Sequence, residues 1–161
     1  MSGETPQAVE HVSAFLRESR AEARVEEFST GTPTAAHAAR AVGCELRNIV
    51  KSLVFDCDGR VVLAMVPGDR RADSAKVAAA AGARKASIAS PALVRAATGF
   101  EPGAVAPFGL ARVDAVLIER TLLGLDRLWV GGGSTRHMVG LTPTELVRLS
   151  RAAPLDIVAA D

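Results

Sequence analysis

Residues 98–110 read Thr-Gly-Phe-Glu-Pro-Gly-Ala-Val-Ala-Pro-Phe-Gly-Leu. The three glycines and two prolines of this stretch exclude a helix or a central strand, because proline lacks a backbone donor and glycine loses much entropy on ordering. A flexible linker would be polar, whereas Phe100, Val105, Phe108 and Leu110 are apolar. We therefore expect a shaped loop fixed to a core, with glycine amides left to contact a ligand. A tight structural turn without a ligand explains the composition equally well.

The run from Gly99 to Gly109 resembles the central signature of the YbaK family of aminoacyl-tRNA deacylases, relatives of the editing domain inserted in bacterial prolyl-tRNA synthetases. Gly103 and Pro107 match the Gly-x-x-x-Pro core of that signature. Ala104 and Ala106 depart from it, since members often carry a second glycine and a serine there. The resemblance covers residues 34–158 and leaves the N-terminal residues 1–25, a predicted helix, as the variable part.

The composition predicts one ordinary globular domain over residues 1–161, with 48% hydrophobic and 23% charged residues. A formal charge of +1 argues against a surface that coats nucleic acid, but it allows a small site for one end of an RNA. No apolar run approaches the ~20 residues of a membrane helix, and Met1–Thr5 does not begin a signal peptide. We therefore expect a cytoplasmic protein with no membrane partner. Cys44 and Cys57 lack metal-ligand spacing, so we expect free thiols and neither a metal nor a cofactor.

Helices and strands alternate irregularly along the chain. Strands at 49–55 and 60–66 around Asp58-Gly59 predict a β-hairpin, and both strands are apolar enough to be covered on two faces. Cap residues predict helices that start at Thr34, at Asp73 or Ser74, at Ser90 and, in a capping box with Glu145, at Thr142. Further strands are expected at 86–88, 113–118, 128–130, 138–141 and 155–158. The pattern indicates an α+β fold, and the resemblance implies a curved, mixed, largely antiparallel sheet with surrounding helices.

Lys51 is a cation in the first apolar strand of the predicted hairpin. Such a lysine either reaches water from a sheet edge or points into a cleft. The resemblance implies that it is the lysine the family needs for activity, where it binds a phosphate near the terminal adenosine or steadies the ester oxygens.

Known side-chain machinery for hydrolysis is missing from the sequence, which has no Gly-x-Ser-x-Gly elbow, no Walker loop and no metal-ligand cluster. An aminoacyl-tRNA ester is already activated, so a protein that places a water and stabilises the oxyanion is sufficient. Gly103 is the candidate amide donor, because glycine leaves its N–H open to close approach. Pro107 would hold the loop in shape.

Substrate-contacting roles follow from the same resemblance. Within the loop, the candidates besides Pro107 are Gly99, Phe108 and Gly109. The segment after residues 131–133, a glycine run that is typically a bulge or turn, adds Gly133, Ser134 and His137. In relatives a histidine of this segment restricts the amino-acid pocket, so His137 is a candidate contact rather than a general base.

The resemblance therefore implies a free-standing deacylase that removes a wrong amino acid from tRNA. Its expected partners are the acceptor end of a mischarged tRNA and an aminoacyl-tRNA synthetase; the sequence predicts no oligomeric state. Two alternatives stay open at this point. One is a non-catalytic module that binds aminoacylated RNA ends, a synthetase or a small ligand, and the other is a hydrolase of an unrelated small ester.

Overall fold

A computed structural model describes residues 6–32 and 34–160. Its helices are α1 (Pro6–Glu18), α2 (Ala35–Val42), α3 (Ser74–Ala81), α4 (Pro91–Thr98) and α5 (Pro143–Ser150), with short 3-10 helices η1 (Leu46–Asn48) and η2 (Arg120–Gly124). Its strands are β1 (Val25–Glu27), β2 (Val50–Cys57), β3 (Arg60–Pro67), β4 (Ser87–Ile88), β5 (Ala115–Glu119), β6 (Leu128–Ser134), β7 (His137–Leu141) and β8 (Ala153–Leu155).

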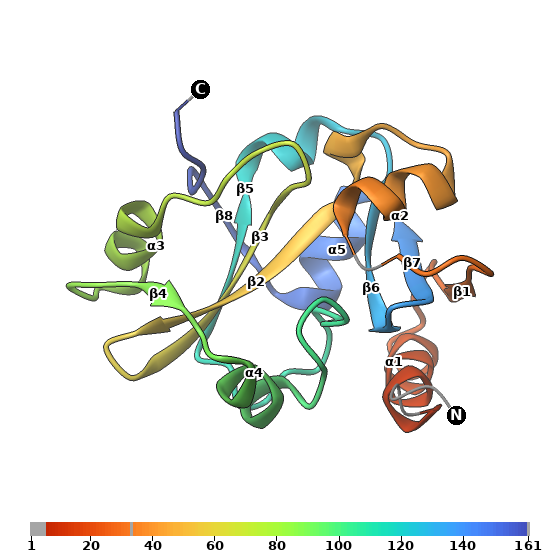
Figure 1. Cartoon of the computed structure of the whole chain (residues 1–161), viewed down its shortest axis with the longest axis horizontal. Helices are drawn as coiled ribbons and strands as arrows, with labels where there is room; N and C mark the ends of the chain where they lie inside the picture. Colours follow the sequence, from red (N-terminus) through yellow and green to blue (C-terminus); the bar gives the residue numbers. More distant parts are fainter. Residues whose placement is uncertain (1–5, 33, 161) are drawn as a thin grey trace.

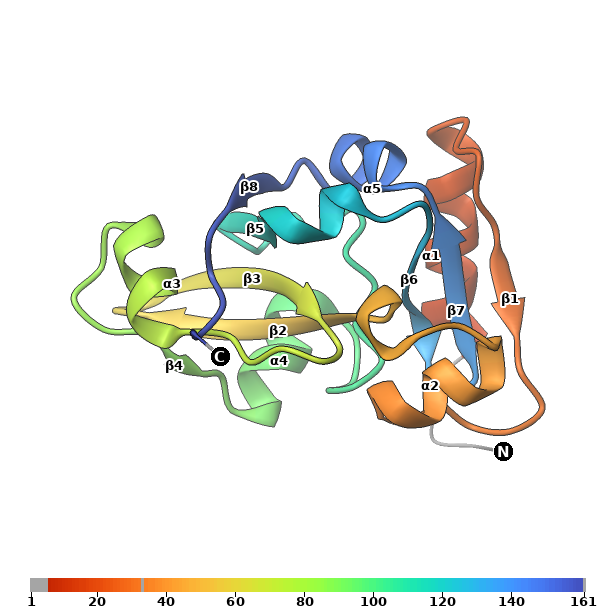
Figure 2. The same cartoon turned by 90° about the horizontal axis from the view of Figure 1, so that it is seen from above.

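The strands form two sheets instead of the single curved sheet expected, and the mixed α+β class is confirmed. One sheet has the order β4-β2-β3-β5-β8, in which β4, β2 and β3 pair antiparallel and β3, β5 and β8 pair parallel. The other is the antiparallel sheet β1-β7-β6. A bridge between Ile49 and Trp129 joins the two sheets where β2 begins. Figure 1 shows this end of β2 close to β6. Seen from above, β2 and β3 lie side by side, and the beginning of β2 and the end of β3 are near α2 and β6 (Figure 2).

The β2–β3 hairpin is confirmed, and its turn is the two residues Asp58-Gly59. Both have positive φ, 54° and 91°, which is the type I′ geometry that Asp-Gly favours. Successive side chains of β3 enter different hydrophobic clusters. Leu63 and Met65 pack in one, and Val62 and Ala64 pack in the other, so the strand is buried on both faces as predicted.

Helix ends follow the cap residues. Thr34, Asp73, Ser90 and Thr142 each accept a hydrogen bond from a backbone amide of the first turn. The predicted capping box is only half formed, however. The amide of Glu145 donates to Thr142 Oγ1, but the Glu145 carboxylate accepts from Arg148 and from the amide of Glu22.

Two strand predictions need correction. β1 begins at the end of the predicted N-terminal helix, residues 1–25, where no strand was predicted, and it becomes a strand by pairing with β7. The closing strand β8 begins at Ala153, ahead of the expected 155–158, because it pairs parallel with β5. In the part of the chain described, no helix has the length and apolar character required to cross a membrane.

Glu119 is a buried acid that ties the end of β5 to the C-terminal segment. Its side chain accepts hydrogen bonds from the amides of Thr121, at 2.8 Å, and Ile157, at 3.0 Å. Burial alone would raise the pKa of Glu119, but these hydrogen bonds outweigh it and hold the pKa below its usual value. The ionised carboxylate therefore stabilises the fold.

We expect Glu119→Gln to lower the free energy of unfolding at pH 7 by about 1–3 kcal/mol, because one buried amide loses its acceptor. Since the folded-state pKa is lowered, the contribution of Glu119 is present above its unfolded pKa and is lost as pH falls through the folded value. Urea unfolding of both proteins across acidic pH measures this, with the exposed Glu101→Gln as control. Equal stability of the two proteins at pH 7 would contradict the assignment.

Candidate functional site

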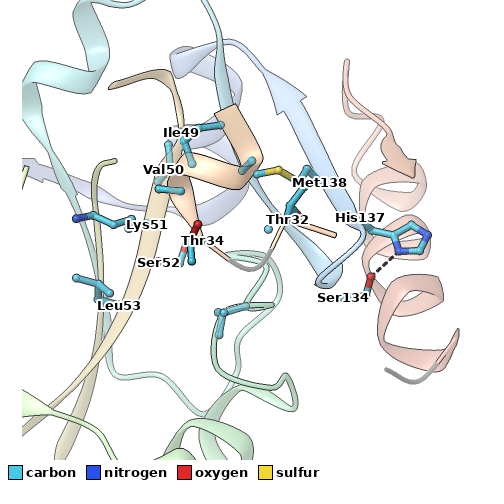
Figure 3. Close-up of a pocket in the computed structure, with 15 residues that line it drawn as sticks. Thr32, Thr34, Ile49, Val50, Lys51, Ser52, Leu53, Ser134, His137 and Met138 are labelled. Atoms are coloured by element: carbon cyan, nitrogen blue, oxygen red, sulfur yellow. Dashed lines mark hydrogen bonds between the residues drawn. The ribbon is translucent and has the colours of Figure 1, made fainter. Parts of the chain in front are cut away.

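A cavity of about 330 Å³ lies where the beginning of β2, the beginning of α2, the loop after α4 and the β6–β7 hairpin meet. Its wall combines apolar side chains with hydroxyl groups and two titratable side chains (Figure 3). The lining residues are Thr32, Thr34, Ala35, Ala38, Ile49, Val50, Lys51, Ser52, Leu53, Gly103, Val105, Gly131, Ser134, His137 and Met138.

The loop after α4 is anchored as its composition predicted. Gly99 ends α4 in the left-handed conformation, with φ 76°. Phe100 and Phe108 are buried, and Phe108 stacks on Phe15 of α1 with ring centroids 5.8 Å apart. These anchors hold the segment between them against the cavity.

Gly103 and Val105 bring main-chain amides with no hydrogen-bond partner to the wall. Between the loop's two phenylalanines, Ala104 donates its amide to Glu101 O at 2.9 Å, and the amides of Gly103, Val105 and Ala106 make no hydrogen bond with any described residue. Val105 and Ala106 are buried residues. Buried amides are nearly always paired, so this loop carries unused donors beside a cavity.

The glycine run of β6 lets this loop approach the strand. A β-carbon on Gly131 would lie 2.4 Å from the carbonyl oxygen of Val105, and one on Gly132 would lie 2.8 Å from the backbone of His137. The strand register shifts between Gly131 and Ser134, so of the two predictions, a bulge or a turn, the glycine run follows the first and stays within β6. Gly133 has φ 102° and faces the backbone of Ala8 in α1. The run therefore serves close packing of main chains.

Lys51 lies on the wall formed by β2. Its ammonium donates to the carbonyl of Arg70 at 2.5 Å and is turned away from His137 (Figure 3). Burial lowers the pKa of Lys51 below its ordinary value; the charge of Asp69 opposes this shift and that of Arg71 adds to it. Lys51 is thus a partly desolvated cation held by a main-chain oxygen.

Ser134 and His137 form the opposite end of the cavity in this view (Figure 3). Ser134 Oγ and His137 Nδ1 are 2.6 Å apart, and Ser134 Oγ also accepts from the amide of Arg136 at 2.9 Å. His137 Nε2 lies 3.8 Å from a carboxylate oxygen of Glu27 in β1. The imidazole is therefore oriented through Nδ1 by Ser134, with a carboxylate near its other nitrogen.

The cavity brings together four of the residues predicted from the sequence, Lys51, Gly103, Ser134 and His137. The other candidates lie outside its lining: Gly99, Pro107, Phe108, Gly109 and Gly133. Of these, Pro107 and Gly109 line a separate groove with residues of α1 and α5.

Several lining residues were not predicted as part of a site, among them Thr32, Ser52 and Met138. Thr34 was expected only as a helix cap. Ser52 carried a usable signal, since a hydroxyl next to Lys51 interrupts an apolar strand. Within residues 6–32 and 34–160, no group of three or more His, Cys, Asp or Glu side chains is placed to hold a metal ion.

The sequence family is shown by a match to the model of the aminoacyl-tRNA editing domain, which covers residues 30–149. The chain belongs to this family. The resemblance stated from the Gly99–Gly109 signature is thereby confirmed, and the cavity described above lies in an editing domain.

Relatives of this editing domain include both similar-sized and much longer proteins. The uncharacterized protein YwhH of Bacillus subtilis (strain 168) is 37% identical over 127 residues, which cover 78% of this chain and 80% of YwhH. The proline--tRNA ligase of Xanthomonas oryzae pv. oryzae (strain MAFF 311018) is 33% identical over 137 residues, 83% of this chain but 24% of the ligase. A solved structure described as a "putative trans-editing enzyme for prolyl tRNA synthetase" is 35% identical, with TM-score 0.88 over 97% of this chain and 99% of that one.

We expect Gly131→Ala to lower the free energy of unfolding by about 1–3 kcal/mol, because the new β-carbon must push the Val105 carbonyl away. Gly124→Ala is the matched control, since nothing lies within 4 Å of its added carbon, and we expect a change within about 0.5 kcal/mol. Denaturant unfolding of both variants measures the difference. If the two substitutions have equal effects, the loop does not depend on this close approach.

Proposed function

We propose that this protein is a trans-editing aminoacyl-tRNA deacylase that hydrolyses the ester bond of a mischarged tRNA. The observation that carries the proposal is that Gly103 and Val105, whose main-chain amides have no hydrogen-bond partner among the described residues, line the same cavity as Lys51. Membership of the aminoacyl-tRNA editing domain family supports the same reaction class.

In the proposed reaction a water molecule attacks the ester carbonyl carbon. The carbonyl oxygen becomes an oxyanion and accepts hydrogen bonds from the amides of Gly103 and Val105, which are already oriented and need no reorganisation. The carbon–oxygen bond to the ribose then breaks, and the proton given up by the water ends on the ribose oxygen that leaves. No covalent intermediate with the protein is needed, because the substrate ester is itself activated.

Lys51 supplies the positive charge in this proposal. The four-carbon stem allows its ammonium to exchange the Arg70 carbonyl for an anionic group of the substrate, either the terminal phosphate or the developing oxyanion. An anion is the stronger partner, because the ammonium attracts a full negative charge more strongly than it attracts the partial charge of a carbonyl oxygen.

Ala104 and Ala106, where the signature departs from its relatives, are 1% and 0% exposed and do not line the cavity. Their methyl groups fill the core beneath the loop. The departure therefore leaves the proposed amide donors unobstructed, which favours a deacylase over a module that only binds aminoacylated RNA.

The proposed partner is the acceptor end of tRNA, and the proposed location is the cytoplasm, where translation takes place. With a net charge of +1, the protein carries little electrostatic attraction for the body of a tRNA. A partner synthetase that presents the mischarged tRNA would supply the missing affinity.

The first test incubates the protein with a panel of mischarged tRNAs. We expect Lys51→Ala to lower kcat/KM for deacylation by about 100-fold or more, as found when a group that stabilises an oxyanion is removed. Lys85→Ala, at an exposed position outside the cavity, should leave the rate unchanged. Binding without turnover would favour the binding module, and equal hydrolysis of aminoacyl esters that lack RNA would favour a small-ester hydrolase.

A second test uses pH. Because burial lowers the pKa of Lys51, the cation is lost at a lower pH than for an ordinary lysine. After subtraction of the spontaneous rate, enzyme-catalysed deacylation should fall as pH rises through this value. Lys51→Arg, whose guanidinium stays charged, should remove the alkaline fall at whatever rate it retains. An identical fall in both proteins would show that another group titrates.

A further inference from the structure

Ser52 has the one buried side-chain polar atom that lacks a hydrogen-bond partner in the described part of the chain. The residue lies in β2 between Lys51 and Leu53, and all three line the cavity. A buried hydroxyl without a partner is destabilising by about 1–3 kcal/mol, so its presence calls for an explanation.

The other hydroxyl groups of the cavity wall are engaged by the fold. Thr32 Oγ1 donates to Thr135 O at 2.8 Å, and Thr34 Oγ1 accepts from the His37 amide at 3.2 Å as the cap of α2. Ser134 Oγ is 2.6 Å from the imidazole of His137. Of the four hydroxyl groups that line the cavity, only that of Ser52 has no hydrogen-bond partner among the described residues.

The position of Ser52 suits a substrate contact. In Figure 3 it lies between Lys51 on one side and His137 on the other, and it shares the cavity wall with Thr34. The residue itself lines the cavity, and rotation about its Cα–Cβ bond gives the hydroxyl three staggered positions from which to meet a ligand.

The rest of the lining limits what the hydroxyl can meet. The lining includes no carboxylate among the described residues, so a cationic side chain would have no counter-charge. Around Ser52 the wall is built from small or aliphatic residues, Ala35, Val50 and Leu53 among them. The chemistry that fits is a small, neutral side chain that carries one hydrogen-bonding group.

We propose that Ser52 Oγ hydrogen-bonds the side-chain hydroxyl of the aminoacyl group, so that the site selects serine or threonine over apolar amino acids of the same shape. The inference rests on the proposed deacylase function and names its substrate class. Ser52 is then a specificity-determining residue. A hydroxyl-bearing substrate pairs the unsatisfied group, whereas an isosteric apolar substrate leaves it unpaired.

The test compares two acyl groups that differ only in hydroxyl against methyl, seryl-tRNA and 2-aminobutyryl-tRNA. We expect the wild-type protein to hydrolyse the seryl ester with a kcat/KM about tenfold or more higher, the ratio expected for pairing one buried hydroxyl. Ser52→Ala should reduce this ratio to about one by slowing the seryl reaction alone. Ser87→Ala, on the exposed strand β4 outside the cavity, should keep the wild-type ratio.

A structural role for Ser52 gives a different result. Removing an unpaired hydroxyl should leave the melting temperature of Ser52→Ala equal to or above that of the wild type, whereas loss of a structural contact would lower it. The inference is overturned if the wild type does not favour the seryl ester or if Ser52→Ala keeps the preference. If alanyl-tRNA or another ester is cleaved without such a preference, the deacylase proposal survives alone. If no member of the panel is cleaved, the proposed function itself fails.

Discussion

The site depends on one close contact between main chains, the carbonyl of Val105 against the α-carbon of Gly131. Any side chain at Gly131 would occupy the position of that carbonyl. The contact seats the loop after α4 on β6, and β6 is joined to the beginning of β2 through the bridge between Ile49 and Trp129. The cavity therefore has walls from both sheets and from the loop after α4, which approaches β6 this closely only because Gly131 has no side chain.

This construction explains how a protein without a side-chain nucleophile can present a reactive environment. Phe100 and Phe108 are buried in the core at the two ends of the loop, so they fix the course of the backbone between them. That path leaves the amides of Gly103, Val105 and Ala106 without partners among the described residues. The unsatisfied donors of Val105 and Ala106, which are buried, have lost their freedom during folding, before any ligand arrives. They are suited to charge that develops during a reaction, because no reorganisation is then required.

The polar groups of the cavity have two different relations to the fold. Thr34 and Ser134 are occupied in a helix cap and a histidine contact, and Lys51 is held by the carbonyl of Arg70. Ser52 Oγ has no such partner. Binding selectivity between similar small side chains is limited when it depends on size alone, whereas a buried hydrogen-bonding group discriminates more strongly. An editing site that must distinguish small amino acids therefore gains most from a buried group, such as Ser52 Oγ, that is free to hydrogen-bond the substrate.

The amino-acid sequence by itself determined the local structure and the family. Local turns and helix ends are set by groups a few residues apart, so the sequence predicts them. The examples are the helix starts at Thr34, Asp73, Ser90 and Thr142 and the turn at Asp58-Gly59. The tertiary structure alone decided which residues share a cavity. Strand β1 exists because a distant strand pairs with it, and Pro107, Phe108 and Gly109 turn away from the cavity because the core takes Phe108. The unpaired state of Ser52 likewise depends on neighbours brought from other segments, and contacts of that range leave no periodic or short-range signal in a sequence.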